Sequence, residues 1–280
     1  MESVDTRCCA DFYSQPEVRQ LLGEHLHPGG EALTTRMIES LRLPRGARVL
    51  DAACGTGAAV MLLARRWGAD AVGLDFSAEN VERARRMAGE AGLGERAAFV
   101  TGDVADLPFD DGAFDAVLCE CAVSTFADAA AAARELARVL KPGGQLGMSD
   151  MAVHGALSER LMLGMAPWTC LAHAMSVEGY QRLFLDSGLR VVGCDDESAA
   201  LVAMGVDLKR KLVMAGLGQL AGVLPGQALD VQQARGLIDE GLARARDGTV
   251  QYVRVVFSKG VPRRTMPWES GGCDPSTGCC

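Results

Sequence analysis

The chain has 280 residues, 49% of them hydrophobic and 23% charged, a globular composition that can supply one large core. Its formal net charge is −8 and aromatic residues make up only 5%, so nothing predicts the basic surface that nucleic acids require. No apolar run is long enough to span a bilayer, and no basic-then-apolar leader opens the chain. We therefore expect a cytoplasmic protein that binds neither nucleic acid nor membrane.

Strand-like apolar runs alternate with helical patterns from residue 47 onward. The predicted strands are ARVLDAAC (47–54), ADAVGLDFS (69–77), AAFVTGDV (97–104), FDAVLCE (114–120), QLGMSDM (145–151), RVVGCD (190–195) and TVQYVRVVFSK (249–259). The predicted helices are 58–67, 77–91 with Ser77 as N-cap, 128–140 and 176–189. This alternation predicts an α/β fold with a doubly wound, Rossmann-like, mostly parallel sheet of seven strands.

The remaining segments predict three additions to this sheet domain, which occupies residues 31–197 and 249–261. Residues 198–248 are mostly helical and fall between the last two strands, so we predict a helical cap inserted there. Residues 1–30 lack a core pattern and form a cysteine-containing arm. Residues 262–280 form a cysteine-rich tail that holds Cys273, Cys279 and Cys280.

A glycine-rich turn, VLDAACGTG, follows the first strand. Gly55 and Gly57 allow the backbone to approach a ligand closely, and the helix that follows presents its N-terminus to a carboxylate or phosphate. A dinucleotide fingerprint would require a third glycine near Val60. The turn therefore predicts a cofactor site and disfavours NAD.

Five segments in this order, VLDAACGTG, VGLDFS, TGDVADLPF, FDAVLCE and VLKPGG, resemble the class I S-adenosylmethionine-dependent methyltransferases over residues 45–150. The resemblance implies that Asp51 and the turn at Ala53, Gly55 and Gly57 hold the methionine end of the cofactor. It implies that Asp75, with Phe76 beside it, takes the ribose hydroxyls, and that Asp103 and Val104 frame the adenine. Ala53 replaces a glycine that is common in the family.

The stretch CECAVS at the end of the fourth strand is the most informative about the substrate. Base-methylating members of the family carry a polar-Pro-Pro-aromatic tetrad there, and this chain does not. Together with PWTCLAHAMSVEGYQRLFLDSGL, the stretch resembles the arsenite methyltransferases. That resemblance implies that Cys121 and Cys170 bind trivalent arsenic, a soft ion that thiolates suit, beside the methyl donor.

The resemblance to arsenite methyltransferases is incomplete. Those enzymes carry a further cysteine just before the first strand, where residues 10–53 have none. Candidates for a third ligand are Cys8, Cys9, Cys119 and the tail cysteines, and the alternative is that two thiolates suffice. The resemblance also implies a thiol reductant, such as glutathione or thioredoxin, beside S-adenosylmethionine. The other cysteines of the domain, Cys54 and Cys194, are predicted to be packing residues.

Two alternatives stay open at this point. The same fold could methylate carbon or oxygen of a small organic substrate, and this would need a base such as His154 or His173. The chain could also be a thiol-based metalloid buffer or sensor without catalytic activity. The sequence makes no prediction about the oligomeric state.

Overall fold

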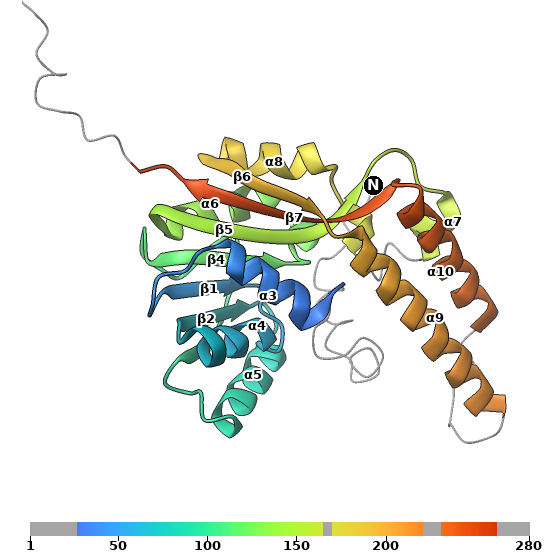
Figure 1. Ribbon diagram of the computed structural model, residues 1–280, viewed down its shortest axis with the longest axis horizontal. Coiled ribbons are helices and arrows are strands. Elements are labelled where there is room, and N and C mark those ends of the chain that lie inside the picture. The colour runs from blue at the N-terminus through green and yellow to red at the C-terminus, as the bar shows by residue number, and fades with distance from the viewer. Residues whose placement is uncertain (1–26, 165–169, 221–230, 262–280) are drawn as a thin grey trace, which may run out of the picture.

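The fold is built on one central sheet. The structure, a computed structural model, describes residues 27–164, 170–220 and 231–261. Its strands are β1 (Arg48–Ala52), β2 (Asp70–Asp75), β3 (Ala97–Thr101), β4 (Phe114–Glu120), β5 (Leu140–Val153), β6 (Leu189–Asp196) and β7 (Val250–Lys259). They form one seven-stranded sheet in the order β3-β2-β1-β4-β5-β7-β6 (Figure 1). The first five strands pair in parallel, and β7 runs antiparallel to both β5 and β6. The predicted fold class is confirmed.

Helices cover both faces of this sheet. They are α3 (Gly30–Ser40), α4 (Ala58–Leu62) with a π-helical turn at Leu63–Trp67, α5 (Ala78–Glu90), α6 (Ala129–Val139), α7 (Glu159–Gly164), α8 (Val177–Asp186), α9 (Ser198–Leu220) and α10 (Val231–Arg246). In Figure 1, α6 and α8 lie on one face, and α3, α4 and α5 lie on the other. Side-chain oxygens of Ser77 and Ser176 accept backbone N–H bonds in the first turns of α5 and α8, which explains where these helices begin. None of the helices in the described ranges is both long and apolar enough to cross a membrane.

The pair α9 and α10 occupies the chain between β6 and β7. The two helices pack on each other through Leu212, Ile238 and Leu242 and extend beyond the end of the sheet (Figure 1). A helical segment before the last strand was predicted from the sequence. Whether it caps a bound substrate stays a prediction.

The fifth strand is longer than predicted. It begins at Leu140, directly after α6, and includes residues Lys141–Gly144, which precede the predicted strand 145–151. The register between β4 and β5 shifts here, because Phe114 pairs with Leu140 whereas Ala116 pairs with Gln145. The glycines therefore form an irregularity inside the strand.

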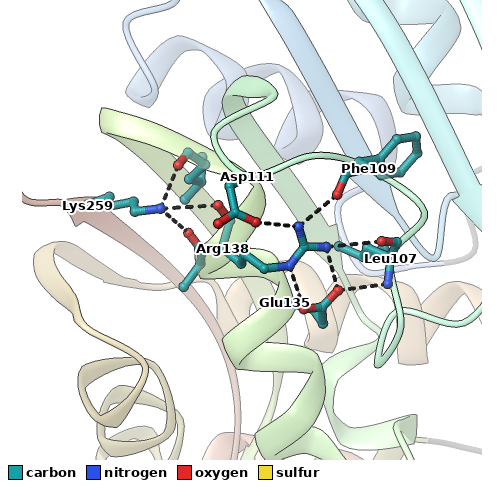
Figure 2. Close-up of polar contacts among 8 residues, drawn as sticks. Leu107, Phe109, Asp111, Glu135, Arg138 and Lys259 are labelled. Carbon is teal, nitrogen blue, oxygen red and sulfur yellow. Dashed lines mark hydrogen bonds and ion pairs between the residues drawn. The ribbon is translucent and has the colours of Figure 1, made fainter.

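Arg138, at the end of α6, forms hydrogen bonds that hold the loop between β3 and β4 in place (Figure 2). Its guanidinium donates to both oxygens of Glu135, to Asp111 at 2.8 Å, and to the carbonyl oxygens of Leu107 and Phe109 at 3.0 and 2.8 Å. These contacts use the planar fork of donors that only arginine offers. Nearer to β3, the same loop carries Asp103 and Val104, which are predicted to frame adenine.

Replacing Arg138 with methionine should lower the free energy of unfolding by about 2 kcal/mol, because two loop carbonyls and two carboxylates lose charge-assisted hydrogen bonds. Chemical denaturation measures this change. Arg210→Met is the matched control, since the Arg210 ion pair with Asp207 is exposed to solvent and should contribute far less than the Arg138 contacts. Equal effects of the two substitutions would contradict the role assigned to Arg138.

Candidate functional site

The candidate site lies where the parallel strands end. Strand order reverses at β1, which lies between β2 and β4. In open α/β sheets, ligands bind outside the carboxyl ends of the strands at such a reversal. Asp51 pairs with Gly73 of β2 and with Leu118 of β4. Because side chains alternate along a strand, Asp51, Asp75 and Glu120 all point to the face of the sheet that α3 and α4 cover.

The turn after β1 is shaped to lie close to a ligand. Ala53, Gly55 and Gly57 all have left-handed backbone angles, with φ of 61°, 53° and 80°. A Cβ atom on Gly55 would have nothing within 4 Å, so this side of the turn is open. A Cβ on Gly57 would lie 2.4 Å from Cε1 of Phe99, so the absence of a side chain allows α4 to begin against β3. The geometry fits a cofactor that contacts backbone.

Asp75 ends β2 and holds the glycine turn in place. Its Oδ2 accepts the N–H of Gly55 at 2.7 Å, and its Oδ1 accepts the N–H of Ser77 at 2.9 Å and Nδ2 of Asn80 at 3.4 Å. A carboxylate has about four acceptor sites, so about one remains, on Oδ2. Burial raises the pKa of Asp75, and the three hydrogen bonds oppose that rise.

Asp51 and Glu120 bring further negative charge to this edge. Burial, Glu120 and Asp75 together raise the pKa of Asp51 well above its usual value. The side chain of Glu120 is 6% exposed, and its Oε2 accepts the hydrogen bond of the Thr34 hydroxyl at 2.9 Å. Its Oε1 is buried and has no hydrogen-bond partner within the described part of the chain. Thr34 and the nearby His27 were not predicted as site residues. The sequence signal that points to this place is Glu120, the acidic residue within CEC, which both of them approach.

The residues predicted to frame adenine follow β3, and Phe76, predicted beside the ribose, follows β2. Val104 is buried, Oδ1 of Asp103 accepts the N–H of Ala105 at 2.8 Å, and Phe76 is 55% exposed beside Asp75. Their contact with a cofactor stays a prediction.

The prediction that Cys119 could be a thiol ligand is wrong in this structure. Cys119 alternates with Glu120 and therefore points to the opposite face, where it packs fully buried in the core beneath α6 and α8. Burial raises the pKa of the Cys119 thiol well above its usual value, which disfavours a thiolate. The strand ends at Glu120, and Cys121 turns away with φ of 53°. The two cysteines therefore do not share a face.

Cys121 lies half-buried at the tip of the site. Its N–H donates to the carbonyl oxygen of Ser149 at 2.6 Å. Its thiol is near Tyr252, whose hydroxyl shares a 3.0 Å hydrogen bond with Ser149 and whose pKa is raised well above its usual value, mainly by burial and then by Cys121. Tyr252 comes from β7, so the last strand contributes to a site that sequence analysis built from the first five.

The second predicted thiol, Cys170, begins the short 3-10 helix η4 (Cys170–His173). This helix packs against η2 (Val123–Thr125), which starts two residues after Cys121. The fold therefore brings the two cysteine segments together, although the Cys170 side chain is outside the described residues. Cys8, Cys9 and the tail cysteines are also outside them. No group of three metal-binding side chains occurs within the described ranges.

The remaining cysteines of the domain, Cys54 and Cys194, differ in how far they are buried. Cys54 is half-buried inside the glycine turn, and burial raises its pKa well above its usual value, as a packing role requires. Cys194 is exposed, so its predicted place in the core is wrong. The reason is that β6 is the edge strand of the sheet and its outer half is largely exposed.

Candidate proton acceptors lie near the carboxyl end of β5 and in the segments that follow it. Asp150 is fully buried and accepts hydrogen bonds from the N–H and the hydroxyl of Ser124 and from the N–H of Met151, and burial raises its pKa to about 6. His154 follows β5, and its buried Nε2 has no hydrogen-bond partner among the described residues. His173 is exposed. Sequence analysis had named both histidines but not Asp150.

The sheet order, the glycine turn and the acidic residue after β2 define a nucleoside-cofactor fold of the methyltransferase type. A family model described as a methyltransferase domain matches residues 49–144. The chain is 30% identical over 212 residues to Methyltransferase GfsG of Streptomyces halstedii, covering 69% of this chain and 76% of that protein. It is 44% identical over 128 residues to a demethylmenaquinone methyltransferase of Thermus thermophilus, covering 45% of this chain and 57% of that protein.

The chain belongs to the class I S-adenosylmethionine-dependent methyltransferases, and S-adenosylmethionine is the cofactor of that family. Among solved structures, the [4+2]-cyclase SpnF has the same fold, with a TM-score of 0.74 and 24% identity over 92% of this chain and 96% of that one. The similarity to SpnF concerns the fold alone.

Proposed function

We propose that this protein transfers the methyl group of S-adenosylmethionine to a carbon or oxygen atom of a small organic molecule. The observation that carries the proposal is the 44% identity to a demethylmenaquinone methyltransferase, an enzyme named for an organic acceptor, over 128 residues. The bound cofactor would supply an electrophilic methyl group on its sulfonium. The chain would place Asp51 and the turn 53–57 at the methionine end, Asp75 and Phe76 at the ribose, and Asp103 and Val104 at the adenine.

An organic acceptor must lose a proton when oxygen, or an activated carbon, is methylated. His154 supports this chemistry because its Nε2 has no partner among the described residues and can exchange a proton at that atom. The proton would leave the acceptor atom as the methyl group arrives, and S-adenosylhomocysteine would be released.

A metalloid acceptor is the second candidate, and one observation favours it. The segment that begins at Cys170 packs against the segment that follows Cys121, as two thiol ligands for one arsenic atom would require. That reaction would need S-adenosylmethionine and a thiol reductant such as glutathione or thioredoxin. The two candidate functions differ in the atom that receives the methyl group, which is carbon or oxygen in the first and arsenic in the second.

The deciding assay follows a deuterated methyl group from S-adenosylmethionine by mass spectrometry. One reaction contains demethylmenaquinol and a set of phenolic and polyketide alcohols, and the other contains arsenite with glutathione. We expect the label on an organic product and S-adenosylhomocysteine in equal amount. Labelled methylarsenicals without any labelled organic product would overturn the proposal in favour of the metalloid.

A further inference from the structure

Glu197 lies at the junction between β6 and α9 and is held there by two arginines. Its Oε2 accepts a hydrogen bond from Nη2 of Arg36 at 2.7 Å, and its Oε1 accepts one from Nε of Arg254 at 3.1 Å. Nη2 of Arg254 also pairs with Asp195 at 2.8 Å. The side chains of Glu197 and Arg254 are 13% and 12% exposed, so solvent screens their ion pair little. Burial alone would raise the pKa of Glu197, but the two arginines lower it below its usual value, so the carboxylate is charged at neutral pH.

The backbone at this junction is hydrogen-bonded to β7 and lies against α3. The N–H of Glu197 donates to the carbonyl oxygen of Tyr252 at 2.7 Å, and the N–H of Tyr252 donates to Oγ of Ser198 at 3.1 Å. A Cβ atom on Gly29 would lie 3.3 Å from Cβ of Ala200, so the start of α3 and the first turn of α9 are in contact (Figure 1). A movement of α3 therefore displaces the start of α9.

The helix α3 also contacts the edge of the sheet where the cofactor is proposed to bind. Thr34 on α3 is fully buried and donates to Glu120 at the end of β4. Because an α-helix has about 3.6 residues per turn, side chains two residues apart leave it on roughly opposite sides. Thr34 therefore faces the edge of the sheet, and Arg36 faces the junction at Glu197. A ligand on the face to which Asp75 points lies beneath α3 and restrains this helix.

We propose that the Arg36–Glu197 ion pair couples the cofactor edge of the sheet to the helix pair α9 and α10, so that a bound cofactor fixes the position of this pair. The inference rests on the cofactor of the proposed function and assigns a regulation to its site. A ligand beneath α3 restrains Arg36, Arg36 holds Glu197, and α9 begins at the next residue. Since the helix pair is predicted to cap the acceptor, the coupling makes the cofactor the first ligand to bind. Arg36 and Glu197 are positioning residues, because they act through α3 and α9.

Hydrogen exchange in α9 measures this coupling without an acceptor. In the unmodified protein, saturating S-adenosylhomocysteine should slow the exchange of backbone amides in residues 198–214 at least about fivefold, the lower end of the usual range for coupled sites. Arg36→Met removes the charged donor and leaves Glu197 paired with Arg254, so the slowing should fall below about twofold. Arg36→Lys should restore most of the slowing, since an ammonium at this position also pairs with Glu197. Because coupling is reciprocal, the Kd of S-adenosylhomocysteine should rise in Arg36→Met by no more than the factor of slowing that is lost.

Arg66→Met is the matched control, because Arg66 also contacts α3, at Thr35 and Glu31, on the solvent-exposed side of that helix. The slowing in residues 198–214 should persist in this variant. Full slowing in Arg36→Met, or an equal loss in Arg36→Met and Arg66→Met, overturns the inference. An unmodified protein that shows protection of residues 52–57 without any slowing in α9 overturns it as well. Failure of the unmodified protein to bind S-adenosylhomocysteine would instead count against the proposed function.

Discussion

Replacing Asp75 with alanine should weaken the binding of S-adenosylhomocysteine by at least about tenfold. The remaining acceptor site on Oδ2 is where a ribose hydroxyl can bind, and a hydrogen bond to a charged acceptor contributes about 1.5–3 kcal/mol. The same substitution removes the acceptor that holds the N–H of Gly55 and thereby loosens the turn. Calorimetric titration measures the affinity, and circular dichroism checks that the variant is folded.

Asn80→Ala separates the two effects of this change. Asn80 donates to Asp75 at 3.4 Å, so its loss weakens the support of the carboxylate and leaves the carboxylate itself in place. Affinity should change less than about threefold while stability falls. Unchanged binding of S-adenosylhomocysteine by a folded Asp75→Ala variant would contradict the role of Asp75 at the ribose.

Replacing Gly57 with alanine should destabilise the fold by about 2–5 kcal/mol. The new Cβ would lie 2.4 Å from the ring of Phe99, which is buried, and overpacking of a core costs about 1–3 kcal/mol. The φ of 80° adds about 1–2 kcal/mol of strain for a residue with a side chain. Urea denaturation of the variant measures the sum.

Gly55→Ala is the matched control for Gly57→Ala, because Gly55 also has a positive φ but a Cβ there would meet nothing within 4 Å. Only the strain of about 1–2 kcal/mol should appear. Equal losses of stability in the two variants would show that the contact with Phe99 is not what requires glycine at position 57.

The sheet was predictable from the sequence because its signals are local. The central strands β1, β2 and β4 are short apolar runs buried on both faces, and the acids at the ends of these runs mark the edge where a ligand binds. The glycine turn has a specific spacing, and Asp75 follows the next strand. These features required no knowledge of which strands are neighbours.

The parts that could not be predicted depend on local backbone angles and on which element covers which face. The predicted strand already ended at residue 120, but only the positive φ of Cys121 shows that its side chain diverges from that of Cys119. Thr34 lies 86 residues before Glu120 and reaches it only because α3 packs over that face. Cys194 is exposed because antiparallel β6 forms the edge of the sheet.

Hydrogen exchange with saturating S-adenosylhomocysteine tests most directly whether the carboxyl edge of β1, β2 and β4 binds S-adenosylmethionine. We expect slower exchange in peptides that cover residues 52–57, 75–80, 103–105 and 120–122, because a ligand there shields the turn and the strand ends. Peptides from β6, at the far edge of the sheet, should exchange as before. Protection confined to α9 and α10, or absent from residues 52–57 and 75–80, would contradict the account.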